Sequence, residues 1–196
     1  MDQPSYRERS LLTITPQDHL QGVIDAPVVL VEYGDYQCPY CAEVHKMMKT
    51  IQQQLNGQPE PPAAASLKSK NHQLCFVFRH FPQKQLHFQA QKAAEAAEAA
   101  AAQGKFWQMH DLLFERQKLL GDGNLLEYAN ELGLDFDQFL HAIAEHQYAD
   151  RVAQDIHSGK QCSVTHTPTL FINGNRYDDA WEVERLITAI LSRSDQ

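Results

Sequence analysis

Cysteine is scarce in this chain, with only four among 196 residues, at positions 38, 41, 75 and 162. Four cysteines are too few to hold a chain of this length together by disulfides, so packing of an apolar core must stabilise it. Basic residues are also few: 17 Lys and Arg stand against 25 Asp and Glu, for a net charge of −8. Because an acidic chain lacks the broad positive field that nucleic-acid binding requires, we expect no nucleic-acid partner.

Long apolar runs are missing as well. No window approaches the roughly 18–20 continuous apolar residues of a membrane span, so we expect no membrane insertion. The N-terminus, MDQPSYRERSLLTITPQDHL, has no apolar segment of the signal-peptide type. If this is the native start, the protein is expected to be cytoplasmic; a signal removed from the chain would instead place it in the periplasm or another exported location.

The pattern of apolar residues predicts an α/β fold. Apolar residues make up 43% of the chain, enough to bury a core. The expected elements are a buried strand at 28–33, a helix from Cys41 to Asn56, a strand at 74–81, four or five helices within 84–160, a hairpin at Asn173-Gly174 and a helix at 181–191. This order predicts a polar lead-in at 1–27, a three-layer domain formed by 28–83 and 161–196, and an inserted helical subdomain at 84–160, with an exposed loop at 58–71.

The sequence Cys38-Pro39-Tyr40-Cys41 follows the first strand directly and begins the first helix. The unpaired N–H groups at a helix start carry partial positive charge, which stabilises a thiolate. In such motifs the pKa of the first cysteine can fall from about 8.5 to about 3.5–7. Cys38 is therefore predicted to be an exposed nucleophile. Cys41, one turn later and facing inward, would resolve the mixed disulfide.

A metal site is the alternative for this pair. One C-x-x-C supplies two ligands, and tetrahedral zinc needs two more. His45 and His80 could complete such a site, whereas Cys75 and Cys162 stand alone in the sequence. A proline inside the motif and a strand before it favour redox chemistry over a metal.

Glu32 interrupts the apolar strand six residues before Cys38. Burial without a partner would raise the pKa of its carboxyl group, which could then carry a proton to or from Cys41. A side chain that reaches solvent at the strand edge is the competing interpretation. Thr167-Pro168, just before the last apolar strand, is the third feature; general frequencies favour a trans peptide bond there.

Four motifs in order, EYGDYQCPYC, FRHFP, GKFWQMHDLLF and THTPTLFING, resemble the DsbA-like branch of the thioredoxin superfamily. The resemblance spans about residues 28–190. It implies a thioredoxin fold with the helical subdomain inserted after the FRHFP strand. It also implies a cis bond at Thr167–Pro168 that lies against the cysteines and offers its backbone to a bound peptide. Glu32 would match the family's buried acidic residue, and Pro39-Tyr40 would tune the redox potential.

Three residues depart from this pattern or lie outside it. Many relatives have Gly where this chain has His166, which could place a cation near Cys38 or turn to solvent. Cys162 could be a third redox cysteine or, as we expect, an inert thiol. Cys75 should lie at the end of its strand away from the site, and we expect no bridge between it and Cys162.

The predicted function is thiol–disulfide exchange with cysteine-containing protein substrates, without cofactor or metal. A thiol redox partner would complete the cycle: a thioredoxin-type protein, glutathione or a membrane oxidant. A glutathione-dependent transferase or isomerase and a metal-binding module remain the alternatives on the same fold.

Overall fold

The computed structural model describes residues 12–56 and 73–193, so the expected loop at 58–71 lies outside the described residues. The strands are β1 (His19–Gln21), β2 (Val28–Gly34), β3 (Leu74–His80), β4 (Thr169–Ile172) and β5 (Asn175–Arg176). The helices are α1 (Pro39–Asn56), α2 (Ala90–Ala101), α3 (Phe106–Glu115), α4 (Asp122–Glu131), α5 (Phe136–Ala144), α6 (Ala149–Gln161) and α7 (Val183–Leu191).

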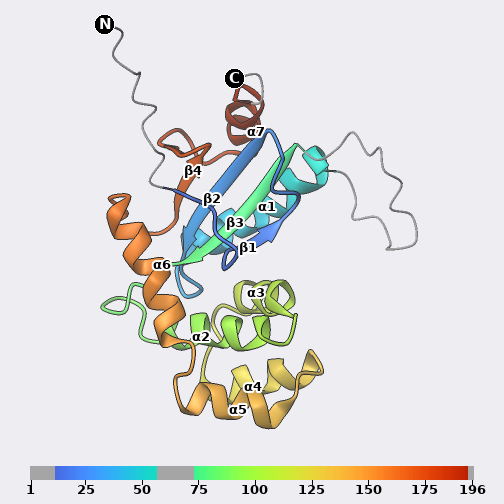
Figure 1. Ribbon diagram of the computed structural model, residues 1–196, viewed down its shortest axis with the longest axis vertical. Helices are drawn as coiled ribbons and strands as arrows, with labels where there is room; N and C mark the ends of the chain where they lie inside the picture. Colours follow the sequence, from blue (N-terminus) through green and yellow to red (C-terminus); the bar gives the residue numbers. More distant parts are fainter. Residues whose placement is uncertain (1–11, 57–72, 194–196) are drawn as a thin grey trace, which may run out of the picture.

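The five strands form one mixed sheet in the order β1-β3-β2-β4-β5 (Figure 1). Strands β2 and β3 are parallel, and β4 runs antiparallel to β2. Strand β2 lies at the centre, which explains its almost continuous apolar sequence. Glu32 lies opposite Phe78 on one side and Leu170 on the other, so its position in the sheet is central and not at an edge.

Strand β1 is an element that the sequence did not predict. The segment 1–27 was expected to be a polar lead-in, but His19–Gln21 pairs antiparallel with β3 and extends the sheet. Its three residues are too few and too polar to show a strand pattern. A buried ion pair beside it fixes the register: Arg79 on β3 donates two hydrogen bonds to Asp18, at 2.7 and 2.9 Å.

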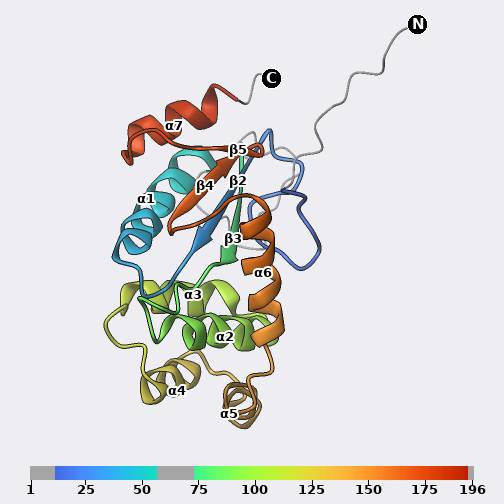
Figure 2. The ribbon, with the colours of Figure 1, turned by 90° about the vertical axis from the view of Figure 1, so that its left-hand side faces the viewer.

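The helices cover both faces of the sheet and one of its ends. Figure 2 shows α1 and α7 on one face, α6 on the other, and α2 to α5 beyond the end of the sheet where β2 and β3 finish. Five helices, α2 to α6, separate β3 from β4, all of them in the described range 73–193. The α/β fold with an inserted helical block, predicted from the sequence, is confirmed. No helix in the described ranges is both long and apolar enough to cross a bilayer.

The alanine-rich helix α2 is the centre of the inserted block. Nine of its residues are buried, including Glu95 and Glu98. Alanine side chains let the neighbouring helices α3, α5 and α6 pack closely against α2. The alanine run is therefore a packed helix and not a linker.

The β4–β5 hairpin turns at Asn173 and Gly174, as predicted. Their φ angles are 48° and 77°, which is the left-handed backbone of a type I′ turn. The turn brings Asn173 back to β2, where its side-chain oxygen accepts a hydrogen bond from the backbone N–H of Val29 at 2.8 Å.

Gly159→Ala should destabilise the protein by about 1–3 kcal/mol, because it overpacks the contact between α6 and the sheet. A Cβ atom at Gly159 would lie 2.8 Å from the ring of Phe81 and 3.0 Å from the ring of Tyr33. The matched control is Gly123→Ala in α4, where a Cβ atom would meet no described atom within 4 Å. The control should be neutral, or stabilising by up to about 1 kcal/mol. Urea unfolding measures both; equal effects would contradict the packing described here.

Candidate active site

Cys38 lies immediately before the first residue of α1, as predicted. Pro39 occupies the first helical position, where its missing N–H costs nothing. The backbone N–H groups of Cys41 and Ala42 donate to the carbonyl of Cys38 at 3.1 and 3.3 Å. From the far side of the site, the carbonyl of Thr167 accepts a hydrogen bond from the Cys38 thiol at 3.4 Å. The sulfur is thus held between the helix start and the segment before β4.

The prediction that Cys38 is exposed was wrong: only 4% of the residue is accessible. The contact with Thr167 and the helix start that follows cover its side chain. The residues inside the motif are the accessible ones, since Pro39 is exposed and Tyr40 is 66% exposed. A partner would therefore meet Pro39 and Tyr40 first.

The two cysteines differ sharply in acidity. A hydrogen bond from the Cys41 thiol, helped by backbone N–H groups of Cys41 and Tyr40, lowers the pKa of Cys38 to about 6, although burial acts against ionisation. Burial raises the pKa of Cys41 well above its usual value, and its hydrogen bond to Cys38 raises it further. At neutral pH the pair therefore consists of one thiolate and one thiol, which is the division that a nucleophile and a resolving cysteine need.

Glu32 is buried in the central strand, with 1% exposure. Its Oε1 atom has no hydrogen-bond partner among the described residues. Burial raises the pKa of Glu32 to about 8, and the negative charge of Cys38 adds to the effect. The carboxyl group is therefore mostly protonated at pH 7. When Glu32 is ionised, its negative charge contributes to the raised pKa of Cys41, so the two groups interact electrostatically.

The Thr167–Pro168 peptide bond is cis in the structure, as the family resemblance implied and against general frequencies. His166, one residue earlier, is exposed, and its Nε2 atom lies 3.1 Å from the guanidinium of Arg176. The side chain is thus engaged with a cation at the surface, which favours the solvent-facing interpretation over a charge aimed at Cys38.

Asp35 is a site residue that sequence analysis missed. It is buried, and its carboxylate accepts hydrogen bonds from the backbone N–H of Gln37 at 2.7 Å and of Gln83 at 2.8 Å. The ring of His87 lies 2.8 Å from the same carboxylate. Asp35 thereby ties the residues before Cys38 to the segment that links β3 with α2. An acidic residue near a C-x-x-C was visible in the sequence, but its partners were not.

Gln117, after α3, is the second missed residue. Its amide donates to the carbonyl of Tyr36 at 2.9 Å and to the carbonyl of Cys38 at 2.6 Å. It therefore fixes the inserted helices against the start of α1. No local pattern could have identified it, because the contact joins residues about eighty positions apart.

Cys75 and Cys162 lie apart from the redox pair. Both have free thiols in the structure. They belong to the apolar cluster on the α6 side of the sheet, whereas Cys38 and Cys41 belong to the cluster on the α1 side. Burial raises the pKa of both thiols, so neither is activated.

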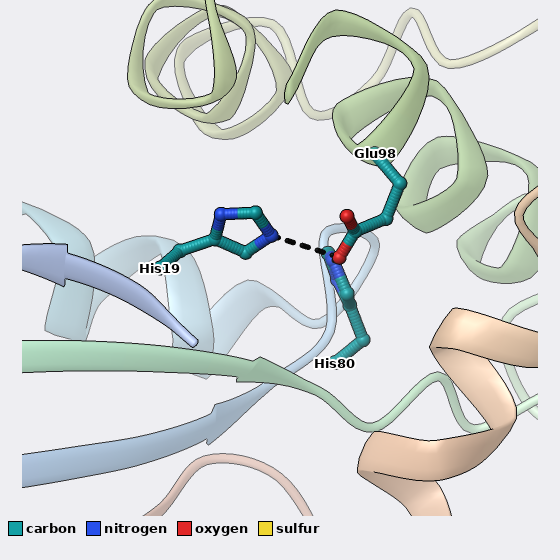
Figure 3. Close-up of side chains that lie close together, drawn as sticks. All are labelled: His19, His80 and Glu98. Carbon is teal, nitrogen blue, oxygen red and sulfur yellow. Dashed lines mark hydrogen bonds and ion pairs between the residues drawn. The ribbon is translucent and has the colours of Figure 1, made fainter. Parts of the chain in front are cut away.

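A histidine–carboxylate cluster lies where the sheet meets α2. Figure 3 shows His19 from β1 and His80 from the end of β3 converging on Glu98. Their Nε2 atoms lie 2.9 and 3.0 Å from the same oxygen, Oε1. Burial opposes ionisation of Glu98, but the hydrogen bonds from the two histidines outweigh it and hold its pKa below the usual range. The Cys2His2 set considered from the sequence is therefore not assembled: His80 pairs with Glu98, and His45 lies near His110 and Asp111.

Comparison with known proteins identifies the family. The profile described as thioredoxin matches residues 14–191. The chain belongs to the thioredoxin family. A thioredoxin-like oxidoreductase from Silicibacter pomeroyi has a TM-score of 0.75 at 22% identity, covering 95% of this chain and 97% of that one. Alpha-DsbA1 from Wolbachia pipientis has a TM-score of 0.74 at 20% identity and covers 94% of each chain. These likenesses confirm the DsbA-like thioredoxin fold.

Curated relatives with higher identity carry a different kind of name. "Na(+)/H(+) antiporter NhaA 3" of Salinispora tropica is 43% identical over 176 residues, which are 90% of this chain and 24% of that protein. "Na(+)/H(+) antiporter NhaA 1" of Salinispora arenicola is 39% identical over 201 residues, 96% of this chain and 28% of that protein. This chain thus spans about a quarter of the length of the curated relatives it matches.

Glu32→Gln should change how stability depends on pH. The folded-state pKa of Glu32, about 8, lies above its ordinary value of 4.5, so the folded protein holds a proton that the unfolded chain has lost. That contribution is complete below pH 4.5 and disappears as pH rises through 8. Between pH 4.5 and 8.5 the reduced protein should lose roughly 2–5 kcal/mol of unfolding free energy relative to the Gln variant. Urea unfolding at both pH values measures this, and parallel pH curves would contradict the burial of an unpaired carboxyl group.

Proposed function

We propose that this chain is a thiol–disulfide oxidoreductase that exchanges disulfides with protein substrates, with Cys38 as nucleophile and Cys41 as resolving cysteine. The observation that carries the proposal is the placement of the motif, with Cys38 directly before α1 against Thr167 and Cys41 buried one turn later. The opposite shifts of the two pKa values agree with it. A structural zinc pair would need further ligands around both sulfurs, and the candidate metal clusters among the described residues contain no cysteine. The thioredoxin-family fold agrees with this chemistry.

The exchange proceeds in two balanced steps. The Cys38 thiolate attacks one sulfur of a substrate disulfide, forms a mixed disulfide and releases the other substrate sulfur as a thiolate that takes up a proton. Cys41 then loses its proton and attacks the Cys38 sulfur, and the second substrate thiolate leaves. The substrate gains two electrons and the protein keeps a Cys38–Cys41 disulfide. Oxidation of a substrate dithiol follows the same steps in reverse.

Glu32 is proposed to move the proton of Cys41. Cys41 is a poor nucleophile while its raised pKa keeps it protonated. The ionised fraction of Glu32 can accept that proton, and the protonated carboxyl group can return it when the disulfide opens. Formation of the mixed disulfide removes the negative charge of Cys38 that helps to raise the pKa of Glu32, and so increases the ionised fraction. The unpartnered Oε1 atom of Glu32 leaves the carboxyl group free for this exchange within the described structure.

Exposed apolar side chains near the motif support a protein substrate. Leu86 and Phe88 are 75% and 81% exposed, and Tyr40 adds a third large side chain. The segment that carries Leu86 and Phe88 is fixed beside Cys38, because Asp35 binds Gln83 and because the Gln37 side chain accepts a hydrogen bond from the N–H of Gln89 at 2.8 Å. Such side chains offer contact area to a polypeptide that a small thiol does not use. We further propose that Pro39, His166 and the Thr167-Pro168 backbone border the bound peptide.

The redox partner determines the direction of exchange. A lowered pKa of Cys38 stabilises the reduced pair and so favours oxidation of substrates, as expected for an exported protein supplied by a membrane oxidant. In the cytoplasm, a thioredoxin-type protein or glutathione would keep the pair reduced and drive reduction of substrates. Antiport of Na⁺ and H⁺ is stated only in the names of the longer relatives.

Replacing the two cysteines one at a time should separate their roles. Cys38→Ser should lower the rate of insulin reduction at least 100-fold, because the attacking thiolate is lost. Cys41→Ser should instead accumulate a mixed disulfide between Cys38 and the substrate, visible on non-reducing gels. Cys162→Ser is the control and should leave both readouts unchanged. A Cys38→Ser protein with the parent rate would overturn the proposal.

A second pair of measurements distinguishes protein substrates from glutathione. Phe88→Ala should lower the rate of exchange with a reduced or disulfide-bonded protein several-fold, while the rate with glutathione stays unchanged. Leu140→Ala, an exposed leucine on α5, is the matched control. If Cys41→Ser keeps full turnover with glutathione and Phe88→Ala affects no protein reaction, the protein is a glutathione-dependent enzyme instead.

A further inference from the structure

Three side chains that thiol exchange does not use meet between α1 and α3. His45 comes from α1, four residues after Cys41, while His110 and Asp111 come from α3. One ligand atom from each lies within 4.8 Å of the other two. Both histidines are buried, and the side chain of Asp111 is partly buried.

His45 lacks a hydrogen bond that its burial should demand. Its Nε2 atom is buried and has no hydrogen-bond partner among the described residues. The Oδ1 atom of Asp111 lies 3.5 Å away, which is too long for a good hydrogen bond. A buried polar atom left without a partner costs about 1–3 kcal/mol, so the arrangement calls for a further group at this point.

The separation of 3.5 Å between His45 Nε2 and Asp111 Oδ1 matches a shared metal ion. With zinc bonds of about 2.0–2.2 Å and tetrahedral angles, two ligand atoms on one ion lie roughly 3.3–3.6 Å apart. The distance is therefore that of two ligands, and not that of a donor and its acceptor.

The surrounding contacts orient the three side chains as outer partners of a metal site would. The Nδ1 atom of His110 lies 3.0 Å from the hydroxyl of Tyr36, which leaves its other ring nitrogen for coordination. Lys49 donates to Oδ2 of Asp111 at 2.7 Å, so Oδ1 remains for an ion.

Protonation also favours a ligand role for the histidines. Burial lowers the pKa of His45 and of His110, so both rings are neutral at pH 7. The positive charges of Lys46 and Lys49 disfavour a bound cation, whereas the negative charges of Asp111 and Glu115 favour one.

We propose that His45, His110 and Asp111 form a binding site for a divalent transition-metal ion, with zinc as its representative. Two imidazoles and one carboxylate suit zinc and leave a fourth position for water. The site goes beyond the proposed thiol exchange, which requires no metal. Because His45 shares α1 with Cys41 and Tyr36 lies two residues before Cys38, the ion would lie close to the active-site motif.

The cluster in Figure 3 is the weaker candidate. Both of its Nε2 atoms lie at hydrogen-bond distance from Glu98, 2.9 and 3.0 Å, shorter than two zinc ligands require. Its hydrogen bonds already satisfy Glu98, and Arg151 lies 3.7 Å from the same oxygen. This cluster therefore provides the control for the experiment.

Zinc binding should be measured on the full chain with both redox cysteines replaced, Cys38→Ser and Cys41→Ser, so that no thiolate of the motif competes. Equilibrium dialysis with zinc chloride followed by elemental analysis should give one zinc per chain. Adding His45→Ala or His110→Ala should weaken binding at least 100-fold, and Tyr36→Phe should weaken it about 10–100-fold through the lost outer contact. His19→Ala should leave the affinity unchanged.

Cobalt substitution provides a second readout, since tetrahedral Co²⁺ with His and Asp ligands absorbs visible light. His45→Gln, which keeps a polar side chain of similar size, guards against a folding defect and is checked by circular dichroism. If the chain with only Cys38→Ser and Cys41→Ser binds no zinc, the proposal is overturned. It is also overturned by a folded His45→Gln variant with parent affinity, or by a loss of binding caused only by His19→Ala, which would place the ion at the cluster in Figure 3.

Discussion

The proposed chemistry depends on the hydrogen bond between the Cys41 thiol and the Cys38 sulfur. It lowers the pKa of Cys38 to about 6 and simultaneously raises that of Cys41. The helix start at Pro39 places the two sulfurs one turn apart and adds backbone donors. The Cys38 sulfur thus carries a charge at neutral pH although the residue is almost fully buried, and the buried Glu32 is proposed to exchange the proton of Cys41.

The rest of the fold keeps this short motif in one position. The central strand β2 ends four residues before Cys38, and the inserted helices α2 to α5 lie beyond that end of the sheet (Figure 2). Asp35 and Gln117 bind backbone groups from Tyr36 to Cys38, and Asp35 also binds Gln83, so the start of the motif is connected to the inserted block. Since the same block carries His110 and Asp111, the proposed metal site and the redox site share one structural support.

Sequence analysis correctly predicted the features that depend on residues close together in the chain. Cys38, Cys41 and the buried Glu32 lie within ten positions, so a strand followed by a helix suffices to place them. Strand β1 escaped prediction because three residues, only one of them apolar, form a strand only through their pairing with β3. Gln117 escaped because its role arises from folding across the inserted helices. The burial of Cys38 also needed the distant Thr167, which no local pattern connects to it.

Titration of the Cys38 thiolate by its ultraviolet absorbance tests the central claim most directly. The reduced protein should show a midpoint near pH 6. Cys41→Ala, which removes the thiol donor and leaves the helix start intact, should move that midpoint up by at least one pH unit toward the value of about 8.5 for free cysteine. A parent midpoint already near that of free cysteine, or one that Cys41→Ala leaves unchanged, would contradict the account.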